Sequence, residues 1–158
     1  MATIRRFEDL EGWQKARKLA NVIYDLTEQP RFARDFKLRD QIQGAAGSVM
    51  HNIAEGFDSG SGPEFIRFLK MARRSASEVQ SELYLALDRK YITREELDVA
   101  YNLATEAKQL INAFIAYLRR HKSPPTIQRS NNPTMYRSND ATNKRKESKC
   151  KPSFTDVI

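Results

Sequence analysis

The sequence predicts an all-α protein: an up-down antiparallel four-helix bundle followed by a disordered basic C-terminal tail. Three observations indicate this fold class. Apolar residues recur three or four positions apart through residues 7–121, which is the helical period. Proline is absent from these periodic segments, and only three of the six glycines fall within them. The pattern stops at Ser123-Pro124-Pro125, so we expect a bundle over residues 1–122 and a tail over residues 123–158.

The first two helices are predicted from their apolar stripes and from the residues that end them. The first covers residues 7–29 and stops at Pro30; its apolar side carries Trp13, Ala16, Ala20, Ile23 and Leu26. The second covers residues 36–55, with a stripe of Leu38, Ile42, Ala45, Val49 and Ile53. Gly56 follows that stripe, so we expect it to be the C′ glycine that ends the helix.

The third and fourth helices begin at predicted capping boxes. Ser61 with Glu64 opens the third helix, which continues to about Lys90, and Thr93 with Glu96 opens the fourth. Both helices alternate steps of three and four between apolar residues: Phe65, Leu69, Ala72, Ala76, Val79, Leu83 and Ala86, then Leu97, Ala100, Ala104, Ala107, Ile111, Phe114 and Leu118. Because the connections are short, consecutive helices should be antiparallel neighbours.

The fourth helix carries a second apolar stripe, formed by Leu103, Leu110 and Tyr117 at steps of seven. One interpretation is a wide core face, since globular helices often bury three or four positions in every two turns. The other is a seam between protomers. Phe68 and Met71 are apolar residues of the third helix that also lie outside its core stripe. We therefore favour a homo-oligomer with Leu103, Leu110 and Tyr117 at its interface.

The predicted tail carries more than half of the net charge of +7. It has seven basic residues against three acids, a net of +4, and little apolar surface with which to offset the entropy of ordering. Its basic block, residues 144–151, could tether nucleic acid nonspecifically. Acids near the start argue against a signal peptide, and no apolar run is long enough to span a membrane. With Cys150 as the single cysteine, we expect a cytoplasmic protein.

The residues needed for catalysis or metal binding are missing. Neither His51 nor His121 has a glutamate three residues before it, as a di-iron bundle would require, and Cys150 lies in the predicted tail. The sequence Gly60-Ser-Gly62 precedes a helix but lacks the following Lys-Ser/Thr of a phosphate-binding loop. We therefore expect no enzyme activity, no metal and no cofactor.

Basic side chains are the positive functional signal. Arg67, Lys70 and Arg74 fall on one face of the third helix with Arg73 adjoining, and Lys15 and Lys18 cluster on the first helix. Such residues can neutralise phosphates without reading a base sequence. The alternative is an ordinary solvated surface, in which nearby acids neutralise these charges: Glu64, Glu78, Glu82 and Asp88.

Two motifs resemble a known family. Ser48-Val-Met-His-Asn-Ile-Ala-Glu-Gly56 and the segment from Glu64 to Glu78 resemble the four-helix-bundle proteins encoded in intervening sequences of bacterial 23S rRNA genes. The resemblance covers about residues 5–120. Met50-His51 departs from it, since the family usually has Pro and a small residue there, and the tail has no family counterpart.

The resemblance implies a homo-oligomer, a pentamer, with a positively charged surface. Related accessory proteins of diversity-generating retroelements associate with a reverse transcriptase and bind nucleic acid. Among the family residues, we interpret Asn52, Glu55, Gly56 and Ser75 as architectural, with Asn52 and Glu55 bonding backbone groups at a helix end. We therefore expect a protein that binds RNA or DNA with little sequence preference; the alternative is a protein-interaction scaffold, such as a reverse-transcriptase accessory subunit.

Overall fold

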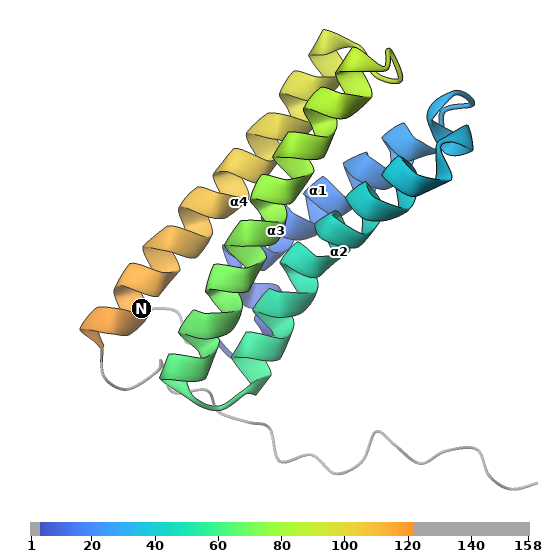
Figure 1. The fold of residues 1–158 in the computed structure, drawn as a ribbon. Helices are drawn as coiled ribbons and strands as arrows, with labels where there is room; N and C mark the ends of the chain where they lie inside the picture. Colours follow the sequence, from blue (N-terminus) through green and yellow to red (C-terminus); the bar gives the residue numbers. More distant parts are fainter. Residues whose placement is uncertain (1–3, 122–158) are drawn as a thin grey trace, which may run out of the picture.

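Four helices form an up-down antiparallel bundle in the computed structural model, which describes residues 4–121 (Figure 1). They are α1 (Glu11–Thr27), α2 (Phe36–Asp58), α3 (Gly62–Asp88) and α4 (Arg94–Arg120), and two 3-10 turns, η1 (Phe7–Asp9) and η2 (Phe32–Arg34), precede α1 and α2. Each helix packs on the next, and α4 packs back on α1. The predicted fold class is confirmed. The predicted tail, with Cys150 and its basic block, lies outside the described residues.

The core consists of two apolar clusters, one toward each end of the bundle. One surrounds Ile23, Phe32 and Leu83, near the α1–α2 and α3–α4 turns, and the other surrounds Ile53 and Phe65 near the opposite end. The predicted stripes of α3 and α4 are buried, with one exchange: Ile115 is buried on α4, whereas Phe114 is half-buried. Alanines at three inward positions of α4 allow the helices to approach closely: Ala100, Ala104 and Ala107.

The first helix starts later than predicted. Residues 7–9 form the turn η1, and Leu10 has an extended backbone with ψ 118°, which interrupts helical hydrogen bonding before Glu11. Asp9 holds this turn, because its carboxylate accepts the backbone N–H groups of Arg5 and Arg6 at 3.2 and 3.1 Å. The apolar period alone did not reveal this break, since Phe7 packs on Trp13 and continues the stripe across it.

The second helix runs past the glycine expected to end it. Gly56 is buried inside α2, which continues to Asp58, so the prediction that Gly56 is a C′ residue is wrong. A Cβ at this position would lie 2.6 Å from Cδ2 of Phe65 and 2.8 Å from Cβ of Phe68. Gly56 is therefore required because α3 approaches the α2 backbone too closely for any side chain.

The two predicted capping boxes have different outcomes. At α4 the box is present: Thr93 Oγ1 accepts the Glu96 N–H at 3.2 Å, and Glu96 accepts the Thr93 N–H at 2.8 Å. At α3, Ser61 occupies the N-cap position but its side chain makes no capping bond, so that prediction is wrong. Glu64 pairs instead with Arg67 one turn later, at 3.0 Å.

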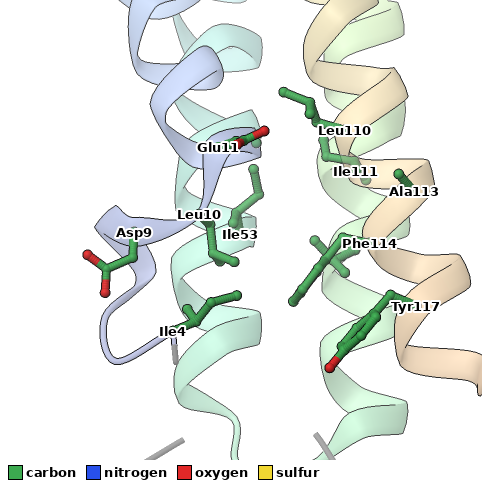
Figure 2. Close-up of a pocket in the computed structure, with 12 residues that line it drawn as sticks. Ile4, Asp9, Leu10, Glu11, Ile53, Leu110, Ile111, Ala113, Phe114 and Tyr117 are labelled. Carbon is green, nitrogen blue, oxygen red and sulfur yellow. The ribbon is translucent and has the colours of Figure 1, made fainter. Parts of the chain in front are cut away.

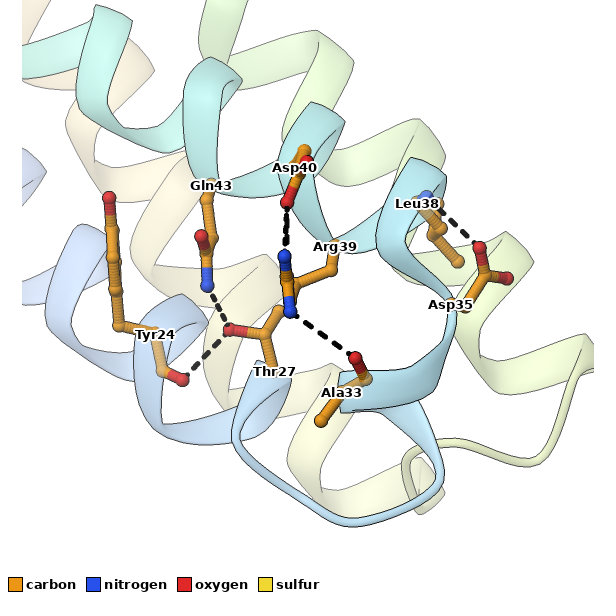
Figure 3. A network of polar contacts seen from close by, with 8 residues as sticks. All are labelled: Tyr24, Thr27, Ala33, Asp35, Leu38, Arg39, Asp40 and Gln43. Atoms are coloured by element: carbon orange, nitrogen blue, oxygen red, sulfur yellow. Dashed lines mark hydrogen bonds and ion pairs between the residues drawn. The ribbon is translucent and has the colours of Figure 1, made fainter. Parts of the chain in front are cut away.

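A polar network fixes the turn between α1 and α2 (Figure 3). The buried hydroxyl of Thr27 accepts a hydrogen bond from Gln43 at 2.7 Å and donates to the Tyr24 carbonyl at 2.8 Å. Asp35 caps α2 by accepting the Leu38 N–H at 3.1 Å. The same carboxylate accepts the Tyr91 hydroxyl at 3.1 Å, which joins this turn to the α3–α4 turn.

Candidate nucleic-acid interface

The α3 cations are exposed and lie in a stretch of helix without acids. Arg67, Lys70, Arg73 and Arg74 all belong to residues 65–77, which contain no Asp or Glu. Arg67 is the one member that pairs with a carboxylate, that of Glu64, and it lies over the Phe68 ring at 4.9 Å. Within residues 4–121, Lys70 and Arg74 form no ion pair. The predicted face on α3 therefore exists and keeps most of its charge.

Arg73 extends this face onto α4. Its Nη1 donates to Asn112 Oδ1 at 3.0 Å, which sets Arg73 in the groove between the two helices. Gln80, seven residues after Arg73 on α3, donates to Thr105, which is seven residues before Asn112 on α4, at 2.8 Å. Tyr84 contacts Tyr101 in the same register, with ring centroids 5.8 Å apart. The helices thus stay aligned, antiparallel, over this whole length.

This register adds three α4 cations that the sequence analysis missed. Lys108 donates to Gln80 Oε1 at 2.9 Å, so it lies in the same groove as Arg73. Arg119 is seven residues beyond Asn112 and hence on the same side of α4, with exposed Arg120 beside it. Residues 107–121 contain no acid. The absence of acids from residues 107–121 was the sequence signal that could have identified these cations. The sequence did not reveal which α3 residues lie beside them.

We define the basic face as seven side chains of α3 and α4: Arg67, Lys70, Arg73, Arg74, Lys108, Arg119 and Arg120. Acidic residues lie at its margins. Glu78 and Glu82, which we considered as neutralising partners, form no ion pair with them. One Glu82 carboxylate oxygen is buried without a hydrogen-bond partner. Loss of solvent raises the pKa of Glu82, and the neighbouring Glu78 raises it further.

Lys15 and Lys18 lie on another side of the bundle. They line a polar groove between α1 and α4 together with Glu11 and Glu106, and Lys15 forms an ion pair with Glu106. The structure therefore does not bring these two lysines together with the α3 cations. Spacing within one helix placed the α3 set correctly, but it held no information about how α1 is rotated relative to α3.

The predicted interface residues Leu103, Leu110 and Tyr117 follow the flank of α4 that faces α1. All three are half-buried: Leu103 and Tyr117 pack against the edges of the two core clusters, and Leu110 lies over Gly12. Next to this flank is a pocket of about 520 Å³ (Figure 2). Phe114 and Tyr117 face Ile4 and Leu10 across it. The stripe is thus partly core and partly accessible apolar surface.

The family residues on α2 and α3 have structural surroundings. Asn52 is buried and donates to the Ser48 carbonyl at 2.8 Å, one turn earlier in the same helix, so it does not cap a helix end as predicted. Glu55 is exposed and Ser75 is half-buried. Across residues 4–121, no three His, Cys, Asp or Glu side chains are grouped to hold a metal, and none of the helices could span a bilayer.

Comparison with known proteins agrees with the two sequence motifs. The model of the 23S rRNA-intervening sequence protein family matches residues 8–113. The chain belongs to this family. The matched region covers all of α1, α2 and α3 and most of α4, so it includes the basic face up to Lys108. Arg119 and Arg120 lie beyond it.

One solved structure is similar to about two thirds of this chain. It is described as a protein of unknown function from the S23 ribosomal protein family of Bacteroides thetaiotaomicron VPI-5482, 28% identical to this chain. The match covers 66% of this chain and 97% of that chain, with a TM-score of 0.61. No curated protein matches significantly. The family and its fold are therefore shown.

Proposed function

We propose that this family member is a non-catalytic, cytoplasmic protein that binds RNA or DNA through phosphate contacts, with little sequence preference. The basic face carries the proposal, because among residues 4–121 only one of its seven cations, Arg67, forms an ion pair, with Glu64. Nucleic acid binds to such a surface with release of condensed counterions, a process that requires charge and little base recognition.

The test is a salt titration of RNA and DNA binding. The full-length chain is used with the five basic residues of the tail block replaced by glutamine, so that Lys144, Arg145, Lys146, Lys149 and Lys151 cannot conceal the bundle's contribution. In this parent, Arg67→Ala/Lys70→Ala/Arg74→Ala should flatten the dependence of log affinity on log salt by up to about three units, because each lost phosphate contact removes roughly 0.9. An unchanged slope, or no binding by the parent at low salt, argues against the proposal.

A homo-oligomer, which the resemblance implies is a pentamer, would repeat the basic face around a symmetry axis. Modest contacts from each protomer would then add through avidity. The half-buried row of Leu103, Leu110 and Tyr117 supports assembly, since apolar side chains on a flank remain accessible after the bundle has closed. The mass of the native assembly, measured with and without structured RNA, tests both the stoichiometry and its link to binding.

The second candidate function is a scaffold for a protein partner, such as a reverse transcriptase. The pocket between α1 and α4 supports it, because its lining is largely apolar and open to solvent. Binding of a protein partner that persists when the basic face is neutralised would favour this candidate. The position of the gene separates the two as well: a place within an rRNA operon favours the first, and a neighbouring reverse-transcriptase gene favours the second.

A further inference from the structure

We infer that the basic face recognises the phosphate backbone of a nucleic-acid duplex and that Lys108 and Arg119 of α4 are contact residues as important as those of α3. The inference rests on the proposed function and narrows its ligand from nucleic acid in general to double-stranded phosphodiester. Three observations carry it: the groups that hold the cations, the arrangement of the cations in two rows, and the placing of the aromatic side chains.

The two cations in the groove between α3 and α4 are held by amides. Arg73 binds Asn112 Oδ1 at 3.0 Å, and Lys108 binds Gln80 Oε1 at 2.9 Å. An amide oxygen orients a cation but leaves its charge uncompensated, and each group keeps further N–H donors for a ligand. Lys15, Arg67 and Arg94 contrast with them, because their partners are carboxylates. The groove therefore presents fixed positive charge at a low cost in side-chain ordering.

The cations form two parallel rows on a rigid support. From Lys108 to Arg119, the α4 row spans eleven residues, or about 16 Å at 1.5 Å per residue. The α3 row, with Lys70 and Arg73, runs beside it at about 8–10 Å, the usual distance between packed helices. These spans are comparable with the roughly 12 Å width of the major groove of B-form DNA. A duplex holds phosphates of both strands at such fixed separations, whereas a flexible single strand does not.

Aromatic rings near the basic face are buried, face α1 or are already in contact with other side chains. Phe65 is buried, Phe114 and Tyr117 face α1, and the half-buried Phe68 is covered by Arg67, whose guanidinium lies 4.9 Å from the ring centroid. The nearest exposed aromatic ring is Tyr84, and it is engaged edge-on with Tyr101 at the far end of the groove. Single-strand binders interleave aromatic rings with their cations so that bases can stack on them. This surface lacks that arrangement and is suited to a ligand whose bases are already stacked.

The experiment compares duplex with single strand in the full-length, tail-neutralised parent. The probes are an RNA duplex and a DNA duplex of about 16 base pairs, a length that spans two successive grooves, and one unstructured strand of each. Binding is measured by fluorescence anisotropy over a range of salt concentrations. We expect tighter binding of a duplex than of its own single strand, and the RNA and DNA arms identify which duplex is preferred. Lys108→Gln/Arg119→Gln should flatten the duplex salt slope by about two units.

Two further variants make the result specific. Arg34→Gln/Lys37→Gln removes the same charge from two exposed residues near the start of α2, at the opposite end of the bundle, and should leave the slope unchanged. Tyr84→Ala should leave duplex affinity unchanged. If Tyr84 stacked on bases, this substitution would weaken single-strand binding. Circular dichroism checks that every variant remains helical.

The outcomes separate this inference from the proposed function. Equal affinity for single strand and duplex, or a full salt slope in Lys108→Gln/Arg119→Gln, overturns the duplex inference while leaving nucleic-acid binding intact. An equal loss of salt slope in Arg34→Gln/Lys37→Gln also overturns it, because the slope would then depend on the net charge of the protein alone. A parent that binds neither form at low salt overturns the proposed function itself.

Discussion

Gly56 of α2 and Phe65 of α3 approach so closely that a Cβ on the glycine would lie 2.6 Å from Cδ2 of the ring. Phe65 is fully enclosed, with edge-to-face contacts to Phe57 and Phe114 at 6.2 and 5.3 Å. The ring therefore has no free direction in which to move away. The absence of a side chain at one α2 position thus sets how closely α3 packs on α2.

Gly56→Ala should destabilise the bundle by about 1–3 kcal/mol, because the added methyl group overpacks the α2–α3 contact. Gly44→Ala is the matched control: it lies in the same helix, and a Cβ there meets nothing within 4 Å. That change should stabilise by about 0.5–1 kcal/mol through helix propensity. Urea unfolding at one protein concentration measures both. Stabilisation by Gly56→Ala would mean that the close approach is absent in solution.

Thr93→Ala should cost about 1 kcal/mol, since it removes the side-chain acceptor of the capping box that opens α4. Ser61→Ala should change stability little, because the Ser61 side chain makes no capping bond at the start of α3. Thermal unfolding of the two variants beside the parent measures the difference. Equal losses at both positions would contradict the geometry of the α3 start.

Leu110→Glu should produce smaller particles that remain helical, if the α1-facing flank of α4 is a contact between protomers. A charge that would be buried in an interface disfavours assembly far more than a charge on an exposed face. Leu85→Glu, on a 46% exposed leucine of α3, is the control and should leave the assembly intact. Light scattering gives the mass and circular dichroism the helicity. Unchanged assembly, or complete unfolding, would favour the interpretation of Leu110 as core.

Glu82→Gln should raise the melting temperature at pH 7. Burial and the neighbouring Glu78 raise the pKa of Glu82 above its unfolded value. Such a carboxyl stabilises the fold while it is protonated, and that stability is lost as the pH rises through the folded-state pKa. The advantage of glutamine should therefore disappear below about pH 4, near the unfolded pKa of roughly 4.3. Glu55→Gln, at an exposed carboxyl of α2, is the matched control for the removal of one negative charge.

The sequence was sufficient to predict the four helices because their apolar stripes are regular and local. The capping signals were less reliable. Thr93 and Ser61 are each followed by glutamate at the third position, yet only the first pair bonds as a box, because Glu64 pairs with Arg67. Gly56 illustrates the same ambiguity: a glycine after a periodic run fits both a helix end and a close helix contact. Only the position of Phe65 distinguishes them.

The candidate site was predicted in part, and the missing part depends on the contacts between helices. Positions 67, 70 and 74 share a face by helical geometry alone. Lys108 and Arg119 join that face only through the α3–α4 register, which the contact of Arg73 with Asn112 defines. Conversely, nothing local indicated that Glu106 would pair with Lys15 and separate it from the other cations. The spacing of residues within one helix predicts which side chains share a face of that helix. It does not predict which faces of different helices lie side by side.

Ile4 and Tyr117 line the same pocket, so the two ends of the described chain lie at one end of the bundle (Figure 2). The helices therefore form a closed cycle, in which the join between α4 and α1 is equivalent to any other turn. A short linker across this join, with new termini opened at Gly60 between α2 and α3, would give a circular permutant with every helix contact retained. The order in which the helices are synthesised is thus separable from the architecture that they form.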